Sequence, residues 1–164
     1  MIALVRVDNR LLHGQILETW VPSLNVRRVV VADDAAAANA LARTAMTLCL
    51  PPGVAAEVVP LAALPWANLA AAKDRVLVLV RDVEALSRAR REGMTADAAP
   101  RVNVGNVHFG AGRRPVTPSV YLSDDEVSTL RDMAAAGFRI EAAAVPSEPP
   151  AGLDEIERRY AAGR

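Results

Sequence analysis

The stretch Val29-Val30-Val31-Ala32-Asp33-Asp34 decides the fold class of this chain. Three consecutive β-branched residues without polar alternation are typical of a strand that is covered on both faces, as strands in parallel sheets are. The two aspartates that follow are suited to cap the start of a helix. We therefore expect a buried strand over Val26–Ala32 that passes directly into a helix.

Strand-like and helix-like segments alternate in the same way along the rest of the chain. Further strands are predicted at the apolar runs Ile2–Val7, Val54–Val59, Val76–Val80, Arg101–Val104, Val120–Leu122 and Phe138–Val145. Helices are predicted over Gly14–Val21, Leu61–Ala72 and Val83–Glu92. Another helix is predicted after Asp34, with Leu41, Ala45 and Leu48 on one side of it. A further helix is predicted to start at a capping box at Ser123 and to end at Ala136. This alternation predicts an α/β fold with a mostly parallel, open twisted sheet and helices on both faces.

We expect one domain over residues 1–164, because a chain of 164 residues is long enough to bury a single sizeable core. The α/β core is expected over residues 1–145. Pro146–Pro150 is predicted to be a hinge-like linker. A final amphipathic helix carries Leu153, Ile156 and Tyr160, and its apolar face can dock on this domain or on a partner.

The overall composition excludes several classes of protein. The formal net charge is zero, which favours neither nucleic acid nor an anionic membrane surface as a partner. No apolar run approaches the roughly 20 residues of a membrane-spanning helix, and the first residues do not form a signal peptide. We therefore expect a cytoplasmic protein that does not insert into a membrane.

Metal and cofactor sites are also disfavoured. The single cysteine, Cys49, excludes an internal disulfide and a multi-cysteine metal site, and we interpret it as a buried structural thiol. The two histidines are far apart in sequence. The loop after the first strand is neither a dinucleotide fingerprint nor a Walker loop. We expect no metal and no cofactor.

The most reactive loop follows the first strand and reads Asp8-Asn9-Arg10-Leu11-Leu12-His13-Gly14-Gln15. Ligands of open α/β sheets bind beyond the carboxyl ends of the strands, which is where this loop lies. A neutral imidazole such as that of His13 is a good nucleophile toward phosphorus. Arg10 offers a planar fork of donors for phosphate oxygens, and the helix that starts near Gly14 offers free N–H groups. Asp8 is expected to orient His13 or Arg10.

The same loop resembles the active-site motif of the mannose/sorbose-family enzyme IIB components of the bacterial phosphotransferase system, whose usual form is Asp-Asp-Arg-Leu-Ile-His-Gly-Gln. Further similarity lies in Val29–Asp33, in Pro52-Gly53-Val54, in Asn103-Val104-Gly105, and from Ser123 to Pro146. The resemblance therefore spans nearly the whole chain. It is most specific at the first motif.

The resemblance implies a soluble α/β domain that acts as a protein-phosphohistidine–sugar phosphotransferase. His13 would accept a phosphoryl group, on Nδ1, from the IIA protein and pass it to a sugar held by the membrane IIC and IID components. Arg10 would help to hold the phosphoryl group. The candidate supporting residues are Asp8, Asn9, Gly14, Gln15, Asn103, Gly105 and Asn106. Sugar choice is expected to lie mainly in the membrane subunits, and the sequence contains no signal for the oligomeric state.

Two positions depart from the family pattern. Asn9 replaces the second acidic residue, which removes a negative charge beside the expected phosphate. Asn106 replaces a glycine, and its side chain is either a phosphate donor or part of a surface turn. His108 is a weaker candidate for a second phosphate contact. The basic pair Arg113-Arg114 is either a contact for an acidic partner or a solvated turn.

The sequence is also compatible with two other functions. One is a regulatory protein of the same fold, in which phosphorylated His13 is read by a partner; Asn9 and the altered loop at Gly105-Asn106 are the reasons for considering it. The other is a binding module that holds an anionic small molecule in the same crevice without covalent chemistry.

Overall fold

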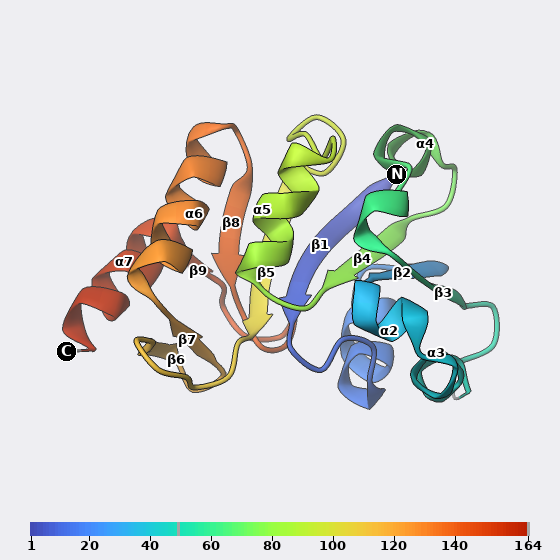
Figure 1. Cartoon of the computed structure of the whole chain (residues 1–164), viewed down its shortest axis with the longest axis horizontal. Helices are drawn as coiled ribbons and strands as arrows, with labels where there is room; N and C mark the ends of the chain where they lie inside the picture. The colour runs from blue at the N-terminus through green and yellow to red at the C-terminus, as the bar shows by residue number, and fades with distance from the viewer. Residues whose placement is uncertain (49, 164) are drawn as a thin grey trace.

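The computed structural model describes residues 1–48 and 50–163, and its elements form one α/β domain (Figure 1). Within the described residues the main sheet has seven strands in the order β3-β2-β4-β1-β5-β8-β9. The strands are β1 (Ile2–Asp8), β2 (Arg28–Ala32), β3 (Ala55–Val59), β4 (Val76–Val80), β5 (Arg101–Asn106), β8 (Arg139–Ala142) and β9 (Ala151–Gly152), with a separate hairpin of β6 (Arg114–Thr117) and β7 (Val120–Leu122). All neighbours in the main sheet pair in parallel except β8 and β9. The predicted fold class is confirmed.

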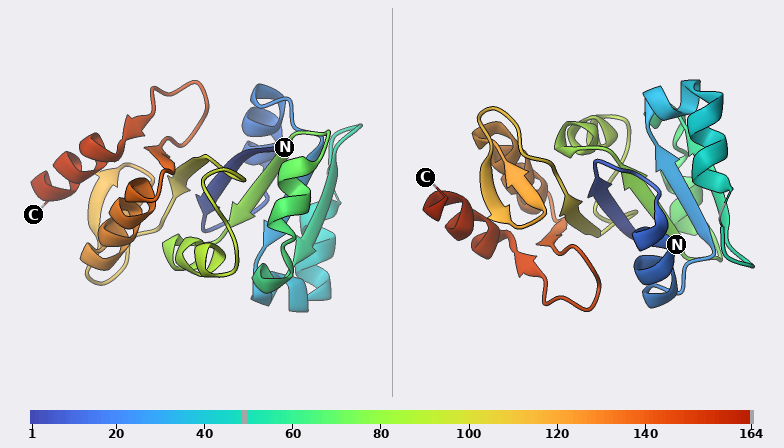
Figure 2. Two further views of the ribbon diagram at one scale, coloured as in Figure 1. Left: turned by 90° about the horizontal axis from the view of Figure 1, so that it is seen from above. Right: turned by 90° about the horizontal axis from the view of Figure 1, so that it is seen from below.

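Helices cover both faces of this sheet (Figure 2). They are η1 (Ile16–Trp20, a π-helix), α1 (Val21–Ser23), α2 (Asp34–Ala38), α3 (Ala40–Thr47), η2 (Leu61–Ala63, a 3₁₀-helix), α4 (Trp66–Ala71), α5 (Val83–Arg91), α6 (Asp124–Ala135) and α7 (Leu153–Ala162). One buried cluster packs Val5 and Val7 of β1 against α4, α5 and α6. The other packs Leu4 of β1 against η1, α1 and α2. The unbroken apolar runs of β2 and β4 are explained by these two layers.

The predicted helix after Asp34 is wrong in its extent, because it is divided into α2 and α3. Asn39 has an extended backbone, and its side chain accepts a hydrogen bond from the N–H of Ala42, so the chain starts a second helix there. The side of α3 and its C-cap that carries Leu41 and Leu48 faces solvent: these two side chains are 78% and 76% exposed. The prediction for Cys49 lies outside the described residues.

The helix that leaves the first loop is longer than predicted. Helical residues run from 14 to 23, and Pro22 does not end them. Residues Ile16–Trp20 form a π-helix, and Pro22 lies in the first turn of α1, where a missing N–H costs little. The capping box predicted at Ser123 is confirmed.

The C-terminal segment returns to the sheet. After β8 the chain makes a turn in which Glu148 accepts a hydrogen bond from the N–H of Ala144, and β9 then pairs antiparallel with β8. Ile156 and Tyr160 of α7 are buried in the same cluster as α6. The amphipathic face of this helix therefore packs on the protein's own core. The sequence pattern missed β6 and β9, which are short.

The strand order places a topological switch point at the carboxyl ends of β1 and β5. The connection that leaves β1 runs toward β2, whereas the chain that leaves β5 runs toward β8, on the other side. In open α/β sheets the crevice that binds ligands lies beyond the carboxyl ends of two strands whose loops diverge in this way. No helix among the described residues is long and apolar enough to cross a membrane.

Candidate functional site

The loop after β1 is folded by the aspartate that begins it. The backbone oxygen of Asp8 accepts a hydrogen bond from the N–H of Leu11 at 2.9 Å, and its Oδ1 accepts one from the N–H of Arg10 at 3.1 Å. Leu11 takes a positive φ of 58°, which is strained for a leucine. Leu11 and Leu12 are both buried in the cluster beneath η1, and this packing holds the strained turn.

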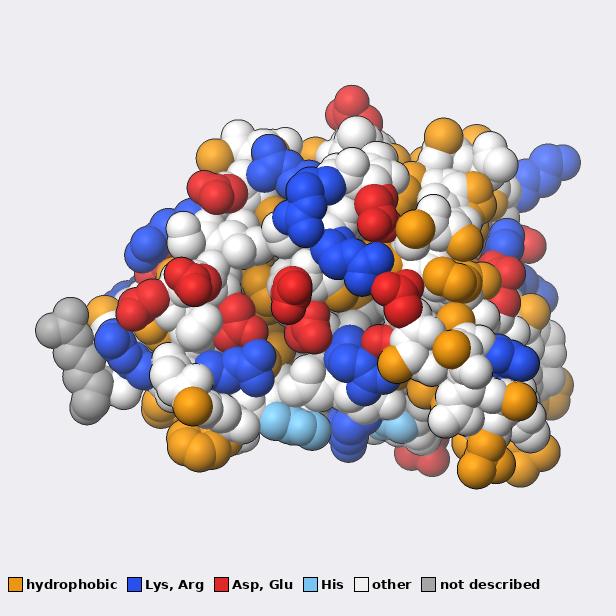
Figure 3. Space-filling view, viewed as in Figure 1, with side chains coloured by type: hydrophobic (Ala, Val, Ile, Leu, Met, Phe, Trp, Pro, Cys, Tyr) orange, Lys and Arg blue, Asp and Glu red, His pale blue; other side chains and the backbone are white. Residues whose placement is uncertain are grey.

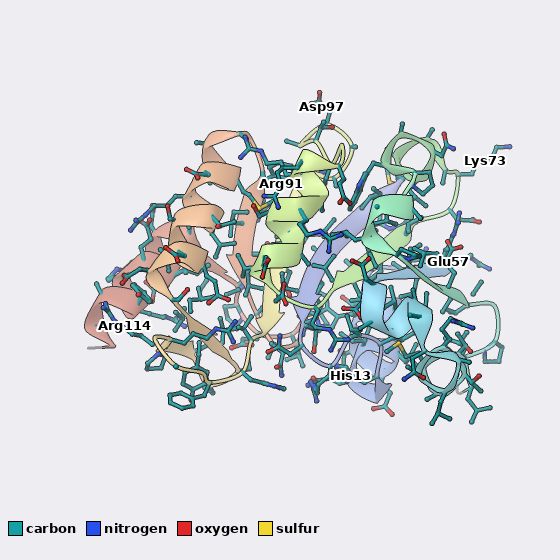
Figure 4. All side chains as sticks on the ribbon, in the orientation of Figure 1. His13, Glu57, Lys73, Arg91, Asp97 and Arg114 are labelled. Carbon is teal, nitrogen blue, oxygen red and sulfur yellow. The ribbon has the colours of Figure 1, made fainter. Side chains whose placement is uncertain are left out.

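His13 follows these two anchors and lies at the edge of the molecule where β1 ends (Figure 4). Its side chain is 18% exposed. The ring atom Nε2 lies 3.2 Å from Oδ2 of Asp8. Figure 3 shows both histidines, His13 and His108, on this edge, with a Lys or Arg side chain between them. The predicted nucleophile is therefore accessible, and one of its two ring nitrogens is engaged.

Asp8 is fully buried and lies at the centre of the charged groups of the site. Its Oδ2 accepts a hydrogen bond from Nη2 of Arg6 at 3.0 Å, and its Oδ1 lies 3.6 Å from Nε of Arg10. Burial alone would raise the pKa of Asp8, but the hydrogen bond with His13 and the charge of Arg6 outweigh it and hold the pKa below its usual value. Asp8 is therefore a carboxylate at neutral pH.

Arg10 and the start of the helix lie beside His13. The Arg10 side chain is 44% exposed, and its Nη2 donates to Oε1 of Gln15 at 2.9 Å. The first helical hydrogen bonds run from Ile16 to the backbone oxygen of His13. The N–H groups of Gly14 and Gln15 precede that bond and have no acceptor within the helix. Gly14 is exposed, so no side chain of its own shields these groups.

Asn9 joins three loops at the edge of the crevice. Its Nδ2 donates to the backbone oxygen of Arg81 at 2.8 Å, and its Oδ1 accepts from the N–H of His108 at 2.6 Å. Its own N–H donates to the backbone oxygen of Asn106 at 3.0 Å. An aspartate at position 9 has no N–H to offer to Arg81. The asparagine is therefore explained by the loops that it connects.

Arg81 is fixed in turn by Asp33, at the end of β2. Its Nε and Nη2 donate to the two carboxylate oxygens at 2.7 and 2.9 Å. These hydrogen bonds hold the pKa of Asp33 below its usual value and raise the pKa of Arg81. The pair therefore fixes the loop after β4, on which the Asn9 contact depends.

The three candidates from β5 are placed differently from one another. Asn103 is fully buried, and its Oδ1 accepts a hydrogen bond from Arg6. The guanidinium of Arg6 also fills the space beside Gly105. Asn106 lies opposite Asp8 in the β1–β5 register, and its buried Oδ1 has no hydrogen-bond partner among the described residues. Asn103 and Gly105 thus accommodate Arg6 beneath the crevice, whereas Asn106 lies at its edge.

Arg6 is the site residue that the sequence reading missed. It lies within the apolar run Ile2–Val7 and has no exposed surface. The sequence does contain one indication of this role. Arg6 and Asp8 are two positions apart on a strand, so their side chains lie on the same face. Since charged side chains are rarely buried unless they are paired, an ion pair between them could have been predicted.

The basic pair after β5 is used within the protein. Arg113 makes a bidentate ion pair with Glu126 at 3.0 and 2.6 Å and donates to the backbone oxygen of His108. Arg114 stacks on the ring of Tyr160 at 4.7 Å. The interpretation of Arg113-Arg114 as a contact for an acidic partner is therefore not favoured. Among the described residues, no three His, Cys, Asp or Glu side chains gather in a way that could hold a metal ion.

Comparison with known proteins agrees with this architecture. The family described as "PTS system sorbose subfamily IIB component" matches residues 2–161. The mannose-specific EIIAB component of the PTS system of Escherichia coli (strain K12) is 31% identical over 151 residues, which are 91% of this chain and 46% of that protein. This chain thus spans about half the length of such relatives.

Two further likenesses extend over whole chains. The N-acetylgalactosamine-specific phosphotransferase enzyme IIB component 2 of Escherichia coli (strain K12) is 27% identical over 156 residues, covering 94% of this chain and 98% of that protein. The IIBSor domain of the sorbose permease from Klebsiella pneumoniae superposes with a TM-score of 0.81 at 24% identity, covering 96% of this chain and 97% of that one. The structural likeness shows the fold.

Proposed function

The chain belongs to the sorbose subfamily of IIB components of the phosphotransferase system, and from this membership we propose that it carries a phosphoryl group on Nδ1 of His13. The donor is a phosphohistidine of a IIA protein. The acceptor is a sugar held by the membrane IIC and IID components. The protein acts in the cytoplasm, where those donors are found.

The observation that supports this proposal is the contact between Nε2 of His13 and Oδ2 of Asp8 at 3.2 Å. A carboxylate can only accept a hydrogen bond, so Nε2 carries the ring proton. The other nitrogen, Nδ1, then has a free lone pair. Because the ring is 18% exposed at the crevice, this lone pair can reach an incoming phosphorus.

The groups around the ring suit the charge of a phosphoryl group in transfer. Such a group spreads negative charge over its oxygens, and catalysis consists mainly of positioning and charge stabilisation. Arg10 supplies a half-exposed guanidinium that Gln15 holds on the same side as His13. The free N–H groups of Gly14 and Gln15 supply a second set of donors at the positive end of the helix.

The transfer step conserves charge and atoms. The lone pair of Nδ1 forms a bond to phosphorus while the donor's N–P bond breaks and its electron pair returns to the donor imidazole. The proton stays on Nε2, so the phosphorylated ring becomes positively charged. Asp8 neutralises that charge from 3.2 Å away.

The test is to incubate the protein with phosphoenolpyruvate, enzyme I, HPr and IIA, and to locate acid-labile phosphate by mass spectrometry. We expect phosphate on His13, no phosphate on His13→Ala, and about a hundredfold slower labelling of Arg10→Ala. His108→Ala removes the other histidine of the same edge, and labelling that persists in it but not in His13→Ala assigns the phosphate to His13. Normal labelling of His13→Ala would end the proposal.

A further inference from the structure

Arg6 is a fully buried cation, and the structure provides an acceptor for each N–H of its two terminal nitrogens. Nη1 donates to Oδ1 of Asn103 at 2.5 Å and to the backbone oxygen of Ala143 at 3.0 Å. Nη2 donates to Oδ2 of Asp8 at 3.0 Å and to the backbone oxygen of Ala144 at 3.2 Å. Burying a guanidinium costs several kcal/mol unless it is paired and hydrogen-bonded in this way.

The surroundings of Arg6 are built to admit it. A Cβ on Gly105 would lie 1.9 Å from two atoms of the guanidinium, so position 105 has room only for a glycine. The guanidinium also lies over the ring of Trp20, with the ring centroid 4.9 Å from the guanidinium carbon. The indole N–H of Trp20 donates to Ala144, the same carbonyl that Arg6 contacts. Three separate segments therefore hold the guanidinium in one place.

Arg6 reaches the nucleophile through one oxygen atom. Oδ2 of Asp8 is 3.0 Å from Nη2 of Arg6 and 3.2 Å from Nε2 of His13. Carboxylates rotate and change protonation state easily when nothing fixes them. A rigid cation on Oδ2 keeps this oxygen unprotonated and pointed at the ring, so the proton of His13 stays on Nε2.

We propose that Arg6 is a positioning residue for phosphoryl transfer: through Asp8 it fixes the Nε2-protonated tautomer of His13 and thereby directs the Nδ1 lone pair to the crevice. This inference rests on the proposed function for its consequence, but its first effect, on the tautomer, exists without a donor. Asp8 contacts the His13 ring directly, and Arg6 and Arg10 in turn contact Asp8.

The test is the ¹⁵N spectrum of the His13 ring, whose two nitrogen shifts report which atom carries the proton. We expect the wild-type protein to hold the Nε2-protonated form, Arg6→Met to show a mixture of both tautomers, and Arg6→Lys to restore part of the preference. Labelling from phosphorylated IIA is expected to fall about 10- to 100-fold in kcat for Arg6→Met, with the KM for the donor unchanged, because the nucleophile is misplaced rather than absent.

Arg101→Met is the matched control. Arg101 pairs with the buried Glu141 at 2.9 Å on the neighbouring strands, without contact to His13 in the structure, so this variant removes a partner from another buried carboxylate of the same sheet. We expect it to lower stability and leave the tautomer unchanged. A folded Arg6→Met with the wild-type tautomer and wild-type kcat would overturn the inference.

If Arg6→Met does not fold, a second variant tests the role of Arg6. Asn103→Ala removes the other side-chain acceptor of Arg6 without changing Asp8 or His13, and we expect a smaller shift in the same direction. A wild-type tautomer in Asn103→Ala would then count against Arg6. The proposed function fails in a different way, when the wild-type protein itself takes up no phosphate on His13.

Discussion

The guanidinium of Arg6 occupies the space that a side chain at position 105 would need. An added Cβ at Gly105 would lie 1.9 Å from Cζ and Nη1 of Arg6, far inside any contact distance. The backbone of β5 can therefore approach the buried guanidinium this closely only because position 105 is a glycine. The effect of this close contact on the free energy of unfolding can be measured.

Gly105→Ala is expected to lower the free energy of unfolding by about 2 kcal/mol or more, because the guanidinium must leave its acceptors or the strand must move. Urea denaturation at pH 7 measures the change. Gly110→Ala is the matched control in the following loop, where the added Cβ meets Arg113 at an ordinary 3.7 Å, and it is expected to be nearly neutral. Equal stabilities of the two variants would contradict the packing described for Arg6.

Asn9→Asp is expected to lower stability by about 1–2 kcal/mol. The new carboxylate still accepts from the N–H of His108 but faces the backbone oxygen of Arg81 without a proton to donate. Denaturant unfolding above pH 6 measures the loss. His108→Ala keeps the backbone N–H that Asn9 contacts, so we expect it to stay within about 0.5 kcal/mol of the wild type. An Asn9→Asp protein as stable as the wild type would show that the three loops hold together without the amide.

The Asp33–Arg81 pair predicts a specific dependence of stability on pH. Because the pKa of Asp33 is lower in the folded protein than in the unfolded chain, where it is about 3.9, the carboxylate stabilises the fold fully above about pH 5. That contribution is lost as the pH falls through the folded pKa, below about pH 4.

Asp33→Asn removes the charge and keeps a good helix cap for α2, whose Ala36 N–H bonds to position 33. We expect it to cost less than about 1 kcal/mol at pH 7, since Arg81 is 41% exposed, and less than that at about pH 3. Denaturation at the two pH values checks this. A loss of the same size at both would assign the effect to something other than the ion pair.

The outward stripe of α3 gives a test of the fold itself. Leu41→Ala is expected to change stability by less than about 0.5 kcal/mol, because the side chain is 78% exposed. Leu12→Ala, in the loop before His13, removes a side chain that is 5% exposed and is expected to cost about 2–5 kcal/mol. Thermal unfolding of both variants measures the difference. A large loss in Leu41→Ala would mean that the stripe is covered.

The local pattern of residues was enough for the fold class and for the reactive loop. Val29-Val30-Val31 predicts a strand buried on both faces, and Val76–Val80 predicts an apolar strand. Both are interior strands of the sheet. Ser123 read as a capping box, because a cap uses only residues three apart. A single stretch of eight residues was enough to predict His13, Arg10 and Asp8 as site residues, because the loop after the first strand is a local feature.

Tertiary structure alone decided what lies around that loop. Arg6 is a site residue because β5, Trp20 and the turn after β8 contact its guanidinium. These segments are up to 138 residues away from Arg6 in the sequence. In the sequence, Asn9 is notable only for the negative charge that it lacks. In the structure, its side chain is hydrogen-bonded to two neighbouring loops. The spacing of Leu41 and Leu48 predicts that they share one side of a helix, and the structure shows that this side is exposed. Periodicity and short motifs report interactions between near neighbours, whereas the burial of a charge or the direction of a helix face depends on which distant segments pack against it.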